Sequence, residues 1–254
     1  MRAGTVTLVG AGPGDPELLT LKAVRAIERA TVLLVDDLVS DEVLAFAASA
    51  ARIVHVGKRG GCRSTPQAFI DKLMAAEALK GEAVVRLKGG DPFIFGRGGE
   101  EAERLRAQGI AVEIVNGITA GLAAVTSLGV PLTHRDHAHG VIFVTAHARA
   151  HGDPLDWRTL AAAAAQGLTL VVYMGVTAVE ALQAGLLHGL PAGTPAAVVQ
   201  HASLPQQRQL ICTLGTLATR VRAERFGSPA IVIVGDVLRG VRTLSQGGAA
   251  EHAA

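Results

Sequence analysis

Residues 83–101 read AVVRLKGGDPFIFGRGGEE, and this stretch decides the fold. It opens with a run of aliphatic residues that predicts a strand over Ala83–Leu87, and it leads into a helix predicted over Glu100–Gln108. Between the two lies a loop that contains five glycines, and residues without a side chain let a ligand approach the backbone closely. A strand that passes through a loop into a helix is the repeating unit of an α/β fold.

The same alternation continues on both sides of this stretch. Further strands of the first half are predicted over residues 5–9, 31–35, 52–56 and 111–115. Helices are predicted over residues 16–30, 41–50, 66–80 and 119–128. This order predicts a mostly parallel sheet with helices on both faces.

The segment GVPLT at residues 129–133 interrupts the pattern, and a second series follows it. Its strands are predicted over residues 141–145, 168–173, 196–200, 209–213 and 230–234. Its helices are predicted over residues 157–165, 178–188 and 216–225. Only a short turn precedes Gln209–Thr213, so this strand should run antiparallel to its predecessor. We expect two α/β domains, residues 1–131 and 132–245, and a frayed tail over residues 246–254.

Composition excludes several classes of protein. Of the 254 residues, 49% are hydrophobic and 18% charged, which is typical of an ordered globular protein. A net charge of +2 argues against a dedicated nucleic-acid binder. Two long uncharged stretches, residues 114–133 and 159–179, are interrupted by polar or helix-breaking residues, so they predict buried core and not a membrane span.

The cysteines predict neither a metal site nor a disulfide framework. Cys62 and Cys212 are the only two, they lack the spacing of zinc ligands, and lone thiols suit a reducing cytosol. The first residues lead directly into a strand and do not resemble a signal peptide. We expect a cytoplasmic protein without a bound metal.

A glycine-rich loop, GAGPGDP at residues 10–16, follows the first strand, and Asp36 ends the second. This arrangement suggests a dinucleotide-binding site, and a nicotinamide-dependent oxidoreductase is therefore the alternative class. The third glycine of that fingerprint, however, would fall at Asp15. Pro16 fits a first helical turn with Asp15 as its N-cap, and a helix that begins so late cannot point its N-terminus at a pyrophosphate. Gly57-Lys58 does not fit a phosphate-binding loop either.

Several long motifs resemble those of the tetrapyrrole methylases. They are GAGPGDPELLTLKA (residues 10–23), VVRLKGGDPFIFGRGGEEAE (84–103), GVPLTHR (129–135), LDW (155–157) and YMG (173–175). The resemblance covers almost the whole chain, from Val6 to Arg242. It implies the fold of the class III methyltransferases, with two α/β domains, an active site in the cleft between them, bound S-adenosylmethionine and a homodimer.

Within the family, the RLKGGDPFIFGRGGEE string favours the members that methylate uroporphyrinogen III twice to give precorrin-2 for sirohaem or cobalamin. A later corrinoid methylase is the sibling alternative. An alternative from another class is a regulator that binds the cofactor without catalysis. The chain keeps the residues expected to transfer protons and to bind the substrate, and this argues against a regulator.

Matching positions carry the family's site residues onto this chain. The resemblance places the cofactor contacts at Pro13, Gly89, Gly90, Asp91, Ile94, Thr119, Ala120, Met174, Ala202, Pro229 and Ala230. It implies that Asp36 accepts a proton and that Lys58 donates one. It also implies that the tetrapyrrole is held or activated by Arg97, Glu100 and Arg135. Arg97 is counted with Asp36 and Lys58 among the catalytic residues.

The chain departs from the family pattern at four places. Ala202 and Ala146 stand where glycine is usual, Asn116 replaces a proline, and Asp37 replaces a common arginine next to Asp36. At residue 202 alanine can still make a backbone contact with the cofactor. Asp37, in contrast, alters the charge next to Asp36, the expected base.

The chemistry suits these residue types. Methyl transfer from a sulfonium is an in-line displacement, which gains most from alignment in a dry pocket. The methylated ring must then lose a proton, which gives a carboxylate such as Asp36 a role. Uroporphyrinogen III carries eight carboxylates, and Arg59, Arg97 and Arg135 suit forked pairing with them. The structural alternatives are a cap or cofactor-positioning role for Asp36, a solvated charge for Lys58 and an intramolecular salt bridge for Arg97.

Overall fold

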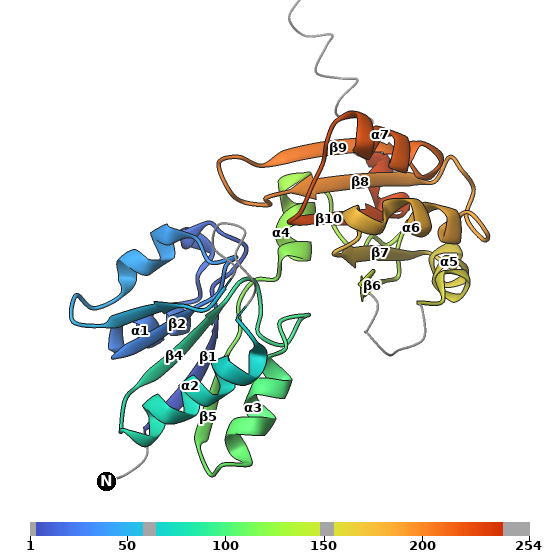
Figure 1. Ribbon diagram of the computed structural model, residues 1–254. Helices are drawn as coiled ribbons and strands as arrows, with labels where there is room; N and C mark the ends of the chain where they lie inside the picture. Colours follow the sequence, from blue (N-terminus) through green and yellow to red (C-terminus); the bar gives the residue numbers. More distant parts are fainter. Residues whose placement is uncertain (1–3, 58–64, 148–154, 241–254) are drawn as a thin grey trace, which may run out of the picture. The chain divides into compact units, whose positions relative to one another are not determined.

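The computed structural model describes residues 4–57, 65–147 and 155–240. The chain divides into two compact units, one ending at Ala120 and the other beginning at Gly121 (Figure 1). The domain boundary at residue 131 stays a prediction; helix α4 (Ala120–Ser127) begins where the two compact units meet. Gly121 N donates a hydrogen bond to the Tyr173 hydroxyl (2.9 Å), so α4 packs against the second sheet.

The first unit is built on a five-stranded sheet in the order β3-β2-β4-β1-β5, and every strand pair is parallel. The strands are β1 (Thr5–Gly10), β2 (Val32–Val35), β3 (Arg52–His55), β4 (Val84–Lys88) and β5 (Ala111–Val115). The predicted parallel sheet is thereby confirmed. Because all strands run the same way, the loops that follow their carboxyl ends lie along one edge.

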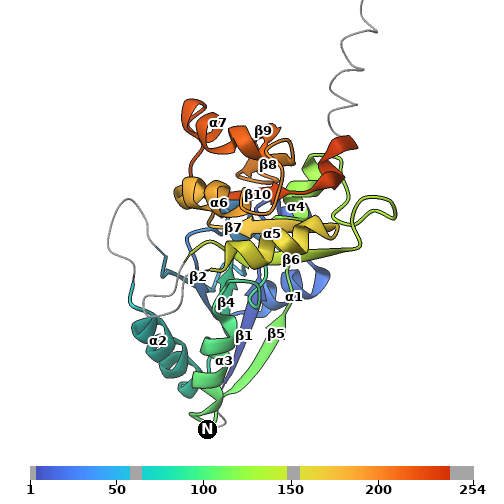
Figure 2. The same ribbon diagram turned by 90° about the vertical axis from the view of Figure 1, so that its right-hand side faces the viewer.

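Helices cover both faces of this sheet, as predicted. Helices α2 (Gln67–Leu79) and α3 (Gly98–Arg106) pack on the face that carries Val6, Leu8 and Leu34. Helix α1 (Leu21–Arg29) packs on the opposite face, against residues such as Val9 and Leu33 (Figure 2). Side chains alternate between the faces of a strand, so one strand serves both cores.

Two predicted helices differ from the structure. Residues 16–30 do not form one helix: Pro16–Leu18 is a single 3-10 turn capped by Asp15, and α1 begins only at Leu21. The break comes at Thr20, which is extended and whose hydroxyl accepts a hydrogen bond from Ala23 N (3.1 Å), as an N-cap does. Asp41–Phe46 forms 3-10 turns where a helix over residues 41–50 was predicted.

The second unit contains a mixed five-stranded sheet in the order β6-β7-β10-β8-β9. Its strands are β6 (Gly140–Thr145), β7 (Leu168–Tyr173), β8 (Pro195–Gln200), β9 (Arg208–Thr213) and β10 (Ala230–Val234). Only β6 and β7 run parallel; β8 and β9 are antiparallel, as predicted from the short turn between them. Helices α5 (Trp157–Ala165), α6 (Val179–Leu186) and α7 (Leu217–Ala223) share one core with the sheet.

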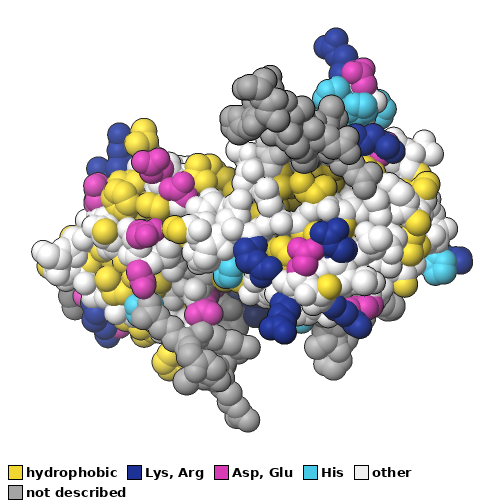
Figure 3. Space-filling view, turned by 90° about the horizontal axis from the view of Figure 1, so that it is seen from above, with side chains coloured by type: hydrophobic (Ala, Val, Ile, Leu, Met, Phe, Trp, Pro, Cys, Tyr) yellow, Lys and Arg dark blue, Asp and Glu magenta, His cyan; other side chains and the backbone are white. Residues whose placement is uncertain are grey.

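The surface carries charges of both signs. On the face drawn in Figure 3, basic and acidic side chains are interspersed, which agrees with the net charge of +2. Every helix in the described part of the chain is too short or too polar to span a bilayer.

Candidate functional site

Three loops, each with at least one glycine, meet at the carboxyl edge of the first sheet. They follow β1, β4 and β5, which are neighbours in the sheet. Gly12 and Gly90 exchange backbone hydrogen bonds, Gly12 N to Gly90 O (3.2 Å) and Gly90 N to Gly12 O (2.7 Å). A Cβ at Gly117 would lie 2.2 Å from Gly90 O, so only glycine allows the third loop to approach this closely. The loops that contain Pro13, Gly89–Ile94 and Thr119 are therefore brought together.

Asp91 joins two of these loops. Its side chain is buried, with 6% of the residue exposed. Oδ1 accepts a hydrogen bond from Phe93 N (2.8 Å), while Oδ2 accepts one from Asn116 Nδ2 (3.1 Å) and one from Gly117 N (3.1 Å). Asn116 stands where proline is usual in the family, and its side chain supplies one of these hydrogen bonds to Asp91. The carboxylate of Asp91 shapes the loops from inside.

The charge of these loops decides which ligand suits them. Residues 10–15, 89–91 and 116–119 contain no lysine or arginine, and their charged side chains are Asp15 and Asp91. The first α-helix after β1 begins only at Leu21. A pyrophosphate would lack cations in these loops, and the loop after β1 leads into a 3-10 turn instead of an α-helix. These loops therefore suit an uncharged or positively charged ligand better than a pyrophosphate.

Asp36 follows β2 at the same edge of the sheet. Its Oδ1 accepts a hydrogen bond from Asp37 N (3.1 Å), and its Oδ2 lies 3.4 Å from Nη2 of Arg86. The side chain is 36% exposed, so a ligand can reach it. Both oxygens of the carboxylate thus have a partner in the protein, Oδ1 in Asp37 N and Oδ2 in Arg86.

Arg97 and Glu100 form an ion pair at the start of α3. Arg97 is the N-cap and has a left-handed backbone (φ 59°). Its Nη2 donates to Glu100 Oε2 (2.8 Å), and Arg104 Nη2 donates to the same oxygen (3.1 Å). The hydrogen bond from Arg97 lowers the pKa of the Glu100 carboxyl and raises the pKa of Arg97. Both side chains remain about half exposed.

In the second unit, four of the expected cofactor contacts gather at one end of the sheet. Met174 follows β7, and Ala230 begins β10, which pairs with β7. His201 N donates to Pro229 O (3.1 Å), which brings the loop of Ala202 to the same place. Met174 has a left-handed backbone (φ 55°), and 43% of the residue is exposed.

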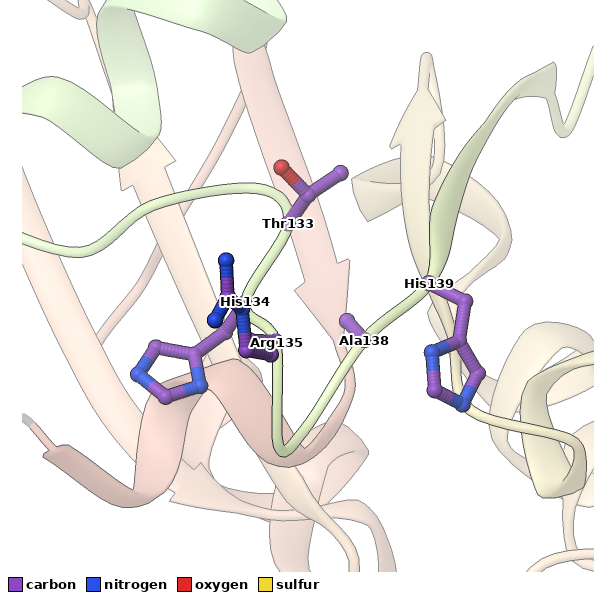
Figure 4. A pocket seen from close by; sticks show the side chains of 5 residues that line it. All are labelled: Thr133, His134, Arg135, Ala138 and His139. Carbon is purple, nitrogen blue, oxygen red and sulfur yellow. The ribbon is translucent and has the colours of Figure 1, made fainter.

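Arg135 lies in a hairpin-like segment whose limbs are joined by hydrogen bonds between His134 and Ala138 (2.9 Å each). The segment lines an open pocket, with His139 on the limb that leads to β6 (Figure 4). The lining residues are Thr133, His134, Arg135, Ala138 and His139. Lys58 and Arg59 lie outside the described residues, as do the tail residues 246–254.

Sequence reasoning missed one group of charged residues. Arg86 and Lys88 are buried in β4, with 2% and 3% of each residue exposed, and Glu101 of α3 is fully buried beside them. The signal was present in the sequence: two cations occur at alternate positions of a strand that is otherwise aliphatic. Charged residues are almost never fully buried unless they are paired.

Comparisons with known proteins agree with this geometry. The family model of the Tetrapyrrole (Corrin/Porphyrin) Methylases matches residues 5–218. The uroporphyrinogen-III C-methyltransferase of Pseudomonas aeruginosa is 55% identical over 240 residues, which cover 94% of this chain and 96% of the relative. The siroheme synthase of Azotobacter vinelandii is 46% identical over 93% of this chain, which matches 50% of that longer protein.

A solved structure resembles the chain as well. It is uroporphyrin-III C-methyl transferase from Thermus thermophilus complexed with S-adenyl homocysteine, with 42% identity and a TM-score of 0.78, covering 93% of this chain and 99% of that one. The family match spans most of the chain and both units. The chain belongs to the tetrapyrrole (corrin/porphyrin) methylases.

Proposed function

We propose that this chain transfers methyl groups from S-adenosylmethionine to uroporphyrinogen III, twice in succession, and so produces precorrin-2 for sirohaem or cobalamin. The observation that carries the proposal is the 55% identity, over nearly the full length of both chains, to a protein named for this reaction. A relative solved with the demethylated cofactor supports the choice of methyl donor. The cradle of glycine loops, which is free of cations, supports the same choice.

We propose two groups of cofactor contacts, one in each unit. The first comprises Pro13, Gly89, Gly90, Asp91, Ile94, Thr119 and Ala120. The second comprises Met174, Ala202, Pro229 and Ala230. The backbone hydrogen bonds between Gly12 and Gly90 and between His201 and Pro229 support each grouping within its own unit. For Asp91 the geometry favours a role in shaping the loop.

For the chemistry, bound S-adenosylmethionine would supply an electrophilic methyl group. The pyrrole carbon is electron-rich and needs no strong activation. The residues of the site therefore mainly orient the substrate and remove a proton from the methylated ring. Each transfer adds one methyl group to the ring and releases one proton, which Asp36 accepts. The resemblance to the family assigns Lys58 the role of proton donor at the same site. Arg97, Glu100, Arg135 and Arg59 hold the substrate, with the guanidinium groups pairing with its carboxylates.

We further propose that the protein acts as a homodimer in the cytoplasm. The sequence contains two cysteines without the spacing of zinc ligands, and such a pair suits a reducing compartment. Light scattering of the purified protein measures the oligomeric state, and a mass equal to one chain would contradict the homodimer.

The decisive experiment incubates the purified protein with methyl-labelled S-adenosylmethionine and uroporphyrinogen III. We expect a product that carries two labelled methyl groups. Methylation of a later corrinoid alone would identify the sibling activity. Tight cofactor binding without turnover would identify a regulator. Binding of NAD(P) without binding of S-adenosylhomocysteine would overturn the proposal altogether.

A further inference from the structure

Four charged side chains form a group beneath the carboxyl edge of the first sheet. Arg86 and Lys88 come from β4, Glu101 comes from α3, and Asp36 follows β2. Burying an ion costs several kcal/mol unless partners compensate for it. The group contains equal numbers of positive and negative charges, and Asp36 is its only member whose side chain is substantially exposed.

The Arg86 guanidinium is held from several sides by rigid parts of the fold. Nη1 donates to Leu34 O of β2 (3.4 Å) and to Leu87 O of β4 (3.1 Å). Nε donates to Glu101 Oε1 of α3 (3.4 Å). With these donors engaged, the remaining nitrogen, Nη2, faces Asp36 Oδ2 at 3.4 Å. At this distance the contact is mainly electrostatic.

Glu101 is the acceptor at the centre of the group. Its Oε1 accepts hydrogen bonds from Lys88 Nζ (3.1 Å) and from Gln67 Nε2 (2.9 Å), in addition to Arg86. Lys88 Nζ also lies 3.0 Å from Oε2. Burial lowers the pKa of Lys88, the neighbouring charge of Arg86 lowers it further, and Glu101 opposes both effects. Glu101 therefore compensates two buried cations at once.

We propose that Arg86 is a positioning residue for the Asp36 carboxylate, and that Glu101 and Lys88 fix Arg86 in its place. The proposal rests on the proposed function, in which Asp36 accepts a proton from the methylated ring. Asp37 N holds one oxygen of Asp36, and Arg86 orients the other. A base held in this way needs no reorganisation when the proton arrives.

The first test compares Arg86→Lys and Glu101→Gln with the unchanged protein. A lysine keeps the charge but cannot reproduce the planar fork that reaches Leu34 O, Leu87 O, Glu101 and Asp36 together. We expect kcat for methyl transfer to fall by about 10–100-fold, which is less than the roughly 10²–10⁴-fold that a general base contributes, because Asp36 is still present but less well oriented. The KM for uroporphyrinogen III and the Kd for S-adenosylhomocysteine should stay within about threefold, since the buried Arg86 side chain offers a ligand almost no accessible surface.

The control is Arg52→Lys. Arg52, at the start of β3, pairs with the buried Glu77 of α2, so the change disturbs another ion pair with a buried carboxylate, away from Asp36, although Arg52 itself is half exposed. We expect an unchanged kcat. Should Arg86→Lys fail to fold, Glu101→Gln and Lys88→Met provide the same measurement, because each loosens Arg86 indirectly.

The second test places Arg86→Lys in an Asp36→Asn background. If Arg86 acts through Asp36, the added change should lower the residual rate by less than about threefold, because the two effects are not additive. A full additional loss would overturn the proposal. So would a wild-type kcat in Arg86→Lys, or a loss of S-adenosylhomocysteine affinity equal to the loss of kcat. Absence of methyl transfer by the unchanged protein would instead refute the proposed function.

Discussion

Arg97 and Glu100 pair through two parallel hydrogen bonds, Nε to Oε1 (3.2 Å) and Nη2 to Oε2 (2.8 Å). Both residues are expected to hold the tetrapyrrole, and in the structure they hold each other. The salt bridge that was the structural alternative for Arg97 is therefore present. This salt bridge is compatible with substrate binding by Arg97. Both side chains are about half exposed, and an exposed ion pair contributes little to stability. A substrate carboxylate can take the place of Glu100 in the same forked geometry.

Arg97→Ala should abolish turnover and leave the affinity for S-adenosylhomocysteine within about threefold, because its proposed partner is a substrate carboxylate. Label incorporation measures the first quantity and calorimetry the second. Arg106→Ala, at an exposed arginine at the end of the same helix, is the matched control and should keep its activity. Equal loss of turnover and of cofactor affinity in Arg97→Ala would assign it a structural role.

Asp91→Ala should weaken cofactor binding by about tenfold or more, since hydrogen bonds to a charged group contribute about 1.5–3 kcal/mol each. The carboxylate accepts from Phe93 N, Asn116 Nδ2 and Gly117 N, so its loss frees two loops. Asn116→Ala removes one of these bonds and should have a smaller effect. Calorimetry with S-adenosylhomocysteine ranks the variants, and an unchanged affinity in Asp91→Ala would contradict this role.

Gly117→Ala should disrupt the cradle, because its Cβ would lie 2.2 Å from Gly90 O and 2.8 Å from Gly10 C, which are backbone atoms that cannot turn aside. We expect loss of cofactor binding together with a destabilisation of about 1–3 kcal/mol, the range for overpacking. Gly99→Ala is the matched control, since nothing lies within 4 Å of its Cβ position. That helical change should be neutral or slightly stabilising. Urea unfolding of both variants checks the contrast.

Glu77→Gln should destabilise the protein in a pH-dependent way. Hydrogen bonds from Arg52 and Lys80 hold the pKa of the buried Glu77 carboxyl below its usual value. A carboxyl with a lowered folded pKa stabilises the protein above its unfolded pKa of about 4.3, and this contribution is lost as the pH falls through the folded pKa.

In urea unfolding, Glu77→Gln should therefore cost about 1–3 kcal/mol at pH 7. The difference from the unchanged protein should shrink in acid below the usual carboxyl range. Glu103→Gln, at an exposed acid of α3, is the control and should show no such trend. A difference independent of pH would mean that shape, and not charge, matters at Glu77.

Local patterns were sufficient to predict most elements of the fold. Aliphatic runs marked the strands, and alternation with helices indicated the parallel first sheet, which the structure confirms. The motifs around Gly89–Glu101 pointed to the family, because residues that serve one ligand must keep their type and spacing. The interpretation of residues 16–30 as one helix was wrong, since apolar periodicity does not reveal that Thr20 caps a new helix.

The glycine loops could be predicted from the sequence because each is formed by neighbouring residues. The roles of Asp36 and Arg97 came from the resemblance to the family. Tertiary structure alone decided the rest. It seated Gly117 against Gly90, joined two loops through Asp91, and buried Arg86 and Lys88 around Glu101. Such contacts arise where strands distant in sequence become neighbours, and a one-dimensional pattern records the residues but not the partners that compensate their charges.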